Sequence, residues 1–172
     1  RLLSRGLGDV YKRQVDASNA GTITGTAEQI INAYADSTIT EASNVALTVN
    51  TANSGTATLT QARSLDALTT GVVTATIANT ALSDLLDDST PLLDANGNNA
   101  FTITIGSGDA SASAADLNAL DALTTVAIDA GNVTAITSSS LADINTLYAS
   151  SGFSGLGDQD ITASDSGSIA AS

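Results

Sequence analysis

The feature that most constrains the fold of this chain is its repetition. The hexapeptide LDALTT stands at residues 65–70 and again at residues 120–125. Two further pairs of segments match: residues 15–36 with residues 128–150, with one residue inserted at Ser140, and residues 77–85 with residues 136–144, without a gap. Three independent registers are hard to obtain by chance, so the sequence predicts a repeat protein.

Each repeat alternates a stretch typical of a strand with a stretch typical of a helix. β-branched residues alternate with other residues in Thr-rich stretches, which predicts short strands at residues 22–24, 47–49, 74–77, 101–105 and 133–136. Apolar residues at helical spacing predict helices near residues 27–36, 59–69, 80–88, 114–124 and 140–149. Three of these helices begin with a capping-box arrangement, formed by Thr26 and Gln29, Ser113 and Asp116, and Ser140 and Asp143.

Strand–helix units of this length cannot bury an apolar face alone and must stack on one another. The predicted fold is therefore an α/β repeat solenoid of short parallel strands alternating with short helices, in which contacts between neighbours dominate stability. The expected units are residues 15–43, 44–71, 72–99, 100–126 and 127–172. An antiparallel β-sandwich of the cell-surface type and a compact α/β domain are the alternatives.

The residue types present exclude many kinds of chemistry. The 172 residues include no His and no Cys. A catalytic imidazole, a thiolate nucleophile, a Ser-His-Asp triad, a zinc finger and a disulfide framework are therefore excluded. We expect a protein that is not an enzyme and has no cofactor, with calcium as the one ion to consider.

The basic residues are gathered at the start of the chain. Four of the five lie in the first fourteen residues, RLLSRGLGDVYKRQ, and only Arg63 follows. The formal charge is −13 for the whole chain, but from Val15 onward 17 acidic residues face one basic residue, a net of −16. Such a surface argues against a nucleic-acid partner.

The opening run of residues 1–14 resembles a translated sequencing adapter. These residues are therefore expected to be a non-native leader, and residues 15–172 a fragment of a repeat array. No stretch approaches the ~18 apolar residues of a membrane span.

Two loops carry oxygen-bearing side chains that suit calcium. Residues 94–99 begin like a calcium loop, but their Gly comes fourth rather than sixth and no Glu stands at the twelfth position, so an Asx-rich turn is the other interpretation. Residues 155–161 resemble the nonapeptide GGxGxDx-hydrophobic but lack its first Gly, and the second Asp falls one place late. The candidate metal ligands are Asp94, Asn96, Asn98, Asp158 and Asp160. Diffuse binding of divalent ions by the acidic surface is the alternative.

Other conspicuous side chains have structural explanations. Asp84, Asp116 and Asp143 share the third position of their predicted helices, where a carboxylate ladder for metal or acid–base chemistry is one hypothesis. Helix capping and favourable placement in the helix dipole explain the same positions without a ligand. Tyr34 and Tyr148 occupy equivalent repeat positions on apolar helix faces, so we expect both to pack in the core.

Pairs of threonines separated by one residue raise a hypothesis of ice binding. They are Thr22 and Thr24, Thr58 and Thr60, Thr74 and Thr76, and Thr102 and Thr104. A flat ladder of threonines on one sheet face could match a water lattice. The spacing from one pair to the next is irregular, however, whereas a regular ladder needs regular coils. Because ordinary strand propensity and cross-strand pairing also explain such pairs, the spacing argues against a ladder.

The motifs LDALTT, VDAS and IDAG, ITGTA and INTLYASSGFSGLGDQDIT together resemble the repeat arrays of very large secreted or surface proteins of marine bacteria and cyanobacteria. These arrays are adhesin-like stalks that sometimes adjoin calcium-binding (RTX) repeats. The resemblance covers Val15–Ser172. It implies an extracellular or cell-surface location and a structural or adhesive role. The implied partners are neighbouring repeats of the same longer chain and cell-surface or glycan targets. A calcium-dependent binding module and an ice-binding solenoid are the alternative functions.

Overall fold

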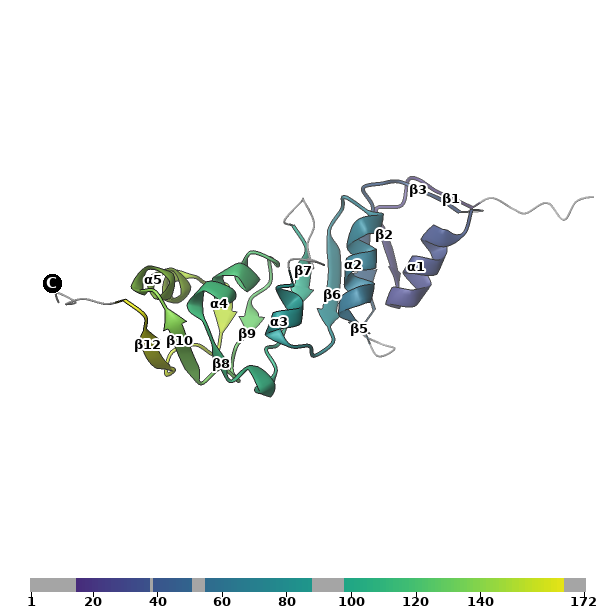
Figure 1. Cartoon of the computed structure of the whole chain (residues 1–172). Helices are drawn as coiled ribbons and strands as arrows, with labels where there is room; N and C mark the ends of the chain where they lie inside the picture. Colours follow the sequence, from purple (N-terminus) through teal and green to yellow (C-terminus); the bar gives the residue numbers. More distant parts are fainter. Residues whose placement is uncertain (1–14, 38, 51–54, 88–97, 166–172) are drawn as a thin grey trace, which may run out of the picture.

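The computed structural model describes residues 15–37, 39–50, 55–87 and 98–165. The helices are α1 (Ala27–Ala35), α2 (Leu59–Leu68), α3 (Leu82–Leu85), α4 (Ala114–Asp121) and α5 (Leu141–Ala149), and residues Ser107–Asp109 form the 3-10 turn η2. The strands are β1 (Val15–Ala17), β2 (Thr22–Gly25), β3 (Ile39–Glu41), β4 (Ala46–Val49), β5 (Thr56–Ala57), β6 (Val73–Ile77), β7 (Ala100–Thr102), β8 (Ser111–Ala112), β9 (Ile128–Asp129), β10 (Ala135–Ser139), β11 (Phe153–Ser154) and β12 (Asp160–Ala163). Figure 1 shows these elements arranged along one axis, from α1, β1 and β3 at one end to α5 and β12 at the other.

Every strand pair in the described part of the chain is parallel. One sheet holds β2, β4, β6 and β5 in that order, with β7 also paired to β6, and another holds β12, β10 and β8; β1 pairs with β3, and β9 with β11. The predicted α/β class with parallel sheets is confirmed, and the antiparallel β-sandwich is wrong.

Paired strands follow one another at a nearly constant step along the sequence. Val15 pairs with Ile39, Leu47 with Val73, and Ala135 with Asp160, and the stretches of chain between partners are almost equal in length. Only the short β5 departs from this step, because Thr56 pairs with Thr76 across a shorter stretch. The stretch of chain from one strand to its usual partner is called a segment below.

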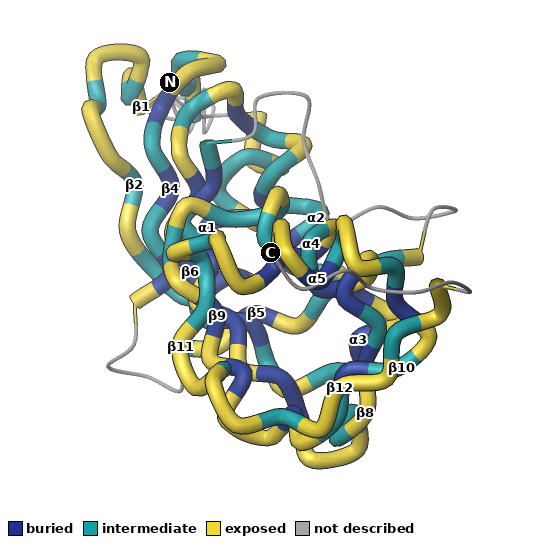
Figure 2. The backbone as a smooth tube through the Cα atoms, turned by 90° about the vertical axis from the view of Figure 1, so that its left-hand side faces the viewer, coloured by how far each residue is buried: buried dark blue, intermediate teal, exposed yellow. Residues whose placement is uncertain are grey.

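One core runs between the sheets and the helices. Alternate strand residues point into it, as in β6, where Val73, Ala75 and Ile77 are buried and the residues between them are more exposed. The helices contribute apolar faces such as Leu117 and Leu120 of α4. In Figure 2 the buried residues gather towards the middle of the tube and most outer turns are exposed. The side chains are small, so each segment needs its neighbours to cover its apolar face.

The helices begin where the sequence places their capping residues. Thr26 accepts a hydrogen bond from the Gln29 N–H, and the Gln29 side chain accepts one from the Thr26 N–H, which completes the predicted capping box. The Ser113 and Ser140 side chains accept from the N–H groups of Asp116 and Asp143, as predicted. A fourth cap was not predicted. Thr58, one of the Thr-x-Thr residues, forms a full capping box with Gln61 at the start of α2.

A Thr58→Ala variant should lose about 1 kcal/mol of unfolding free energy, because the change removes the side-chain acceptor of the capping box. Thr60 lies two residues further on, is exposed and is the matched control. Thr60→Ala should leave stability within about 0.5 kcal/mol of the parent chain. Urea unfolding followed by circular dichroism measures both, and equal losses would show that the cap contributes nothing.

Residues 128–150 hold one more residue than residues 15–36, which they match. In the structure this extra residue lies earlier than Ser140, where the sequence alignment places it. Ser140 caps α5 as Thr26 caps α1, so the insertion does not fall at Ser140. The register between β10 and β12 shifts instead between Ile136 and Ser139. Ser138, inside this bulge, has a φ of 53°, in the left-handed region that non-glycine residues seldom adopt. A bulge absorbs the added residue without moving the helix.

Equivalent residues of that same pair of repeats make equivalent contacts at their first strands. The Asp16 carboxylate accepts a hydrogen bond from the Ser18 N–H, and the Asp129 carboxylate accepts one from the Gly131 N–H, both at 3.0 Å. Hydrogen bonds from Ser18 lower the pKa of Asp16, with the Ser18 hydroxyl as the largest cause.

Of the two tyrosines predicted to pack in the core, Tyr34 and Tyr148, only one does so. Tyr34 packs against the core, whereas Tyr148 is 38% exposed.

Candidate functional site

The repeated hexapeptide LDALTT forms a junction between neighbouring segments. In the first copy the Thr69 hydroxyl donates to the Val45 carbonyl oxygen at 2.6 Å and accepts from the Gly71 N–H at 2.9 Å. In the second copy the Thr124 hydroxyl donates to the Phe101 carbonyl oxygen at 2.7 Å. Thr124 also accepts a hydrogen bond at 3.2 Å, from the backbone N–H two residues on. In both copies the first threonine therefore binds the backbone of the preceding segment, just before β4 in the first copy and within β7 in the second.

The aspartate of the hexapeptide reaches the segment that follows. The Asp66 carboxylate accepts from the Asn99 side-chain amide at 2.6 Å, and the Asp121 carboxylate accepts from the Ser150 hydroxyl at 2.7 Å. Asn99 is buried, and its side-chain carbonyl oxygen accepts from the Val73 N–H at 2.9 Å. The aspartate and the first threonine of LDALTT thus contact segments on opposite sides. Sequence reasoning found the repeated motif but assigned no role to these side chains.

Three helices are completed at their first residue by a side chain from the next segment. The N–H groups of Leu82, Ala114 and Leu141 donate to Asp109, Ser139 and Asp165, at 3.1, 2.7 and 2.6 Å respectively. The first N–H groups of a helix have no partner inside the helix, so an outside acceptor stabilises its start. The start of each of these helices therefore depends on the segment that follows it.

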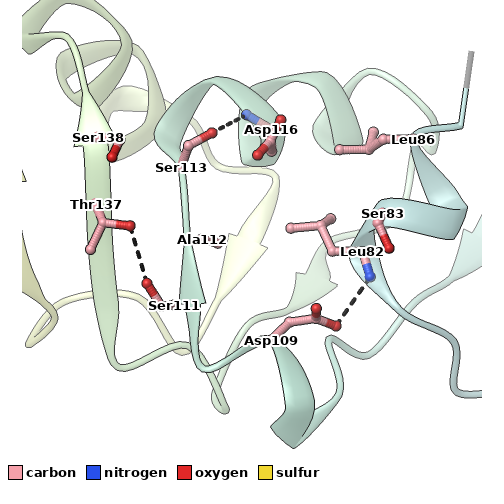
Figure 3. Close-up of a pocket in the computed structure, with 10 residues that line it drawn as sticks. All are labelled: Leu82, Ser83, Leu86, Asp109, Ser111, Ala112, Ser113, Asp116, Thr137 and Ser138. Carbon is pink, nitrogen blue, oxygen red and sulfur yellow. Dashed lines mark hydrogen bonds between the residues drawn. The ribbon is translucent and has the colours of Figure 1, made fainter.

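A hollow lies where α3, the strand β8, the start of α4 and β10 meet. It has a volume of about 540 Å³ and is open to solvent. Figure 3 shows its lining: Leu82, Ser83, Leu86, Asp109, Ser111, Ala112, Ser113, Asp116, Thr137 and Ser138. The helix α3 has four residues where the others have eight to ten, and this shortness leaves the space beside it.

Most of the polar groups around this hollow already serve the fold. The Asp109 carboxylate accepts from the Leu82 N–H, and the Ser111 and Thr137 hydroxyls share a hydrogen bond of 3.1 Å. The Ser113 hydroxyl accepts from the Asp116 N–H at 3.0 Å, as a helix cap. These bonds pair the three hydroxyls with one another or with backbone, not with a general base. The hollow offers hydroxyl groups and carboxylates to a ligand.

The candidate calcium ligands fall in different parts of the structure. Asp94 and Asn96 lie outside the described residues, while Asn98 is half-buried. Asp158 and Asp160 are exposed, in a loop organised by the side chain of Gln159, which accepts from the Gly157 N–H and donates to the Val133 and Gly155 carbonyl oxygens. The described residues contain no group of three acidic side chains close enough to hold a metal ion. Calcium binding stays a prediction.

Calcium and magnesium should raise the melting temperature of the full chain by equal amounts at equal concentration. With 17 acidic residues and one basic residue after residue 14, the surface repels itself, and any divalent ion relieves that repulsion. The double variant Asp158→Asn with Asp160→Asn should keep the same response. Thermal unfolding after chelation measures the shift. A response that calcium alone produces and the double variant lacks would instead establish a specific calcium site.

Tyr148 should deprotonate at higher pH than an ordinary tyrosine. Burial, and to a smaller degree the charge of Asp158, raises the pKa of Tyr148 above its usual value of 10.0. The neutral phenol is therefore favoured in the fold, and its contribution to stability is present below pH 10 and lost as the pH rises through the folded-state pKa. The difference in tyrosinate absorbance between the full chain and Tyr148→Phe measures this pKa. Asp158→Asn should lower it only in part, and complete loss of the shift would contradict burial as the main cause.

Comparison of the chain with protein-family models, with curated proteins and with solved structures finds no match. The resemblance to surface-protein arrays therefore rests on the motifs alone. Within the part of the chain that the structure describes, no helix is long and apolar enough to cross a membrane.

Proposed function

We propose that the chain is a non-catalytic structural module of a large extracellular or cell-surface protein, an α/β solenoid that separates what lies on either side of it. The observation that carries this proposal is the nearly constant step along the sequence between paired strands, kept from β1 and β3 at one end to β10 and β12 at the other. Each added segment would extend the sheets by one strand, about 4.8 Å. A constant step in sequence is thereby converted into a constant step along one axis.

The hydrogen bonds between segments support the same function. Thr69 and Thr124 bind backward to the preceding segment, and Asp66 and Asp121 bind forward to the next one. In an enzyme, repeated polar residues would be expected to converge on a pocket. Here they are distributed along the length of the molecule, where they hold neighbouring segments at a fixed distance from one another.

The charge distribution suits an exposed module. Arg63 is the only basic residue after residue 14, and its guanidinium donates to the Asp84 backbone oxygen at 3.2 Å. A surface with so strong a negative charge keeps separate molecules apart and the chain soluble. We expect its partners to be neighbouring repeats of the same longer chain, and next to these, cell-surface or glycan targets.

Inserting one extra segment tests the proposal. Ser111 of β8 pairs with Ala135 of β10, so a second copy of residues 111–134 placed after residue 134 adds one full step. The lengthened chain should fold with at least the parent's stability, because a solenoid gains a neighbour contact with each unit. Small-angle scattering should show a longer particle of unchanged cross-section.

The matched control is a half step, a second copy of residues 111–122 at the same place. This insertion leaves the downstream strands out of register with their partners, so it should lower the unfolding free energy. If the full-step insertion destabilises the chain as much as the half-step insertion, or if the particle grows in cross-section, the solenoid proposal is wrong.

A further inference from the structure

The two ends of the stack are sheet edges. The strands β1 and β2 lie at one end, and β11 and β12 belong to the segment at the other. Among the described residues each of these four strands is paired on one side only. An edge strand presents backbone N–H and carbonyl groups to whatever lies beside it. The molecule therefore ends, on both sides, in half of the contact that joins its own segments.

The repeated sequence shows what fits the open side of β1. Asp16 of β1 matches Asp129 of β9. The Asp129 N–H donates to the Ile103 carbonyl oxygen at 3.0 Å, and the Asp129 carbonyl oxygen accepts from the Ile105 N–H at 2.9 Å. Because the two strands match, we expect the same backbone groups of Asp16 to face the open side. One more parallel strand can therefore pair with β1 there.

Apolar side chains at the two ends are exposed where a neighbouring strand is absent. Val15 is 53% exposed, whereas Ile128, its match in the repeat, is fully buried. Ile161 is 50% exposed, whereas Ile136, which lies opposite it on the neighbouring strand, is fully buried. The two buried residues lie on strands with neighbours on both sides. Val15 and Ile161 therefore belong to rows of the core that stop at the ends of the molecule.

The repeat also sets the register for a further strand beside β11. Asp129 of β9 and Ser154 of β11 lie opposite one another. In another copy of the chain the residue that continues this row is Asp16, because Asp16 holds the place of Asp129 in its own repeat. Val15 of that copy then lies opposite Phe153, which is itself only half-buried.

The row that runs through β10 and β12 continues in the same way. Ala112, Ile136 and Ile161 lie opposite one another on β8, β10 and β12. Ile23 matches Ile136, so Ile23 of another copy takes the place beside Ile161. Ile23 lies on the edge strand β2 and is only partly buried. The last strands of one chain and the first strands of another therefore cover each other's exposed apolar residues.

We propose that separate copies of the chain stack end to end, with β11 and β12 of one copy paired to β1 and β2 of the next. The contact joins two different surfaces, so each added copy leaves a free end and the assembly grows as a filament instead of closing as a dimer. The inference rests on the solenoid proposed above, because it uses the same parallel pairing between segments. The partner it names is a second copy of this chain.

The charge of the two ends makes the contact depend on salt. Asp16 at one end and Asp158 and Asp160 at the other are exposed. Chains with a formal charge of −13 repel one another at low ionic strength. Exposed charges are screened over about 10 Å at 0.1 M salt, so added sodium chloride should strengthen the stacking. The repulsion that keeps chains apart at low salt thus sets the condition under which they assemble.

Sedimentation velocity of the full chain, at several concentrations of protein and of sodium chloride, tests the proposal. The parent chain should be a monomer at low salt and should form species at high salt that grow with protein concentration. Val15→Glu and Ile161→Glu each place a charge in one end and should keep the chain monomeric. Val72→Glu adds the same charge at a valine that is 37% exposed and distant from both ends in the sequence, and it should assemble like the parent. Circular dichroism melting establishes that the variants are folded.

An equimolar mixture of the Val15→Glu and Ile161→Glu chains tests the direction of stacking. Each variant keeps the end that the other has lost, so the mixture should form a dimer that neither variant forms alone. If one of the two does not fold, the other still tests the proposal by itself.

Four results would overturn the stacking proposal. They are a parent chain that stays monomeric at high salt, an end variant that assembles like the parent, a Val72→Glu chain that does not assemble, and a single end variant that forms dimers through like ends. If the full-step insertion lengthens the particle while the parent chain does not stack, the solenoid proposal stands and the stacking proposal alone is wrong.

Discussion

A Phe101→Ala variant should lose about 3–5 kcal/mol of unfolding free energy, a large part of the 5–15 kcal/mol typical of a whole domain. Phe101 is fully buried in β7, where it pairs with Ala75 of β6. It is the only aromatic residue buried in the described part of the chain. The residues of the core are mostly Ala, Val, Leu and Ile, and β7 is held by parallel pairing, so the sheet cannot collapse to fill the space that the ring leaves.

Phe153→Ala is the matched control, because Phe153 lies in β11, near the end of the described residues, and is only half-buried. Its loss should be clearly smaller. Urea unfolding followed by circular dichroism measures both variants. In Phe101→Ala we also expect a lower m-value, since β7 lies between the two halves of the stack and its loss would let them unfold separately. Equal losses of unfolding free energy in the two variants would show that Phe101 contributes no more to the core than Phe153 does.

The sequence predicts the helices of this fold well and the strand pairing poorly, for a physical reason. Helix signals are local: the caps at Thr26, Ser113 and Ser140 and the apolar spacing after them lie within a few residues of each other. Strand register is not local, because the partner of Thr48 lies a whole segment away, at Thr74. The α/β class could therefore be predicted, while the register that pairs Thr48 with Thr74 could not.

The same distinction explains the predictions that were wrong. The aligned sequences could not tell whether the added residue fell at Ser140 or at the bulge before it, since both positions lie in a run of Ser and Thr. The analogy with Tyr34 places Tyr148 in the core, but Tyr148 is exposed. Its hydroxyl donates to Gln159, in a loop that no local pattern links to α5. The role of Thr69 was missed because its acceptor belongs to another segment.

A Gly71→Ala variant should lose about 3 kcal/mol, at the upper end of the range for overpacked sites. A Cβ at Gly71 would lie 2.6 Å from the Asn44 carbonyl oxygen and 2.7 Å from that of Val45. Both obstacles are backbone atoms of the preceding segment, so no side chain can turn aside to make room. The N–H of Gly71 is also held by the Thr69 hydroxyl, which ties the clash to the junction itself.

Gly21→Ala is the control, because a Cβ there would have no atom within 4 Å. That variant should stay within about 0.5 kcal/mol of the parent, as surface substitutions usually do. Differential scanning calorimetry of the full chain compares the two. If Gly71→Ala is as stable as Gly21→Ala, the segments are not in close contact at this junction, and a fixed distance from one segment to the next could not be maintained there. A large loss confined to Gly71 would instead show that close contact of backbone with backbone sets the step on which the proposed solenoid depends.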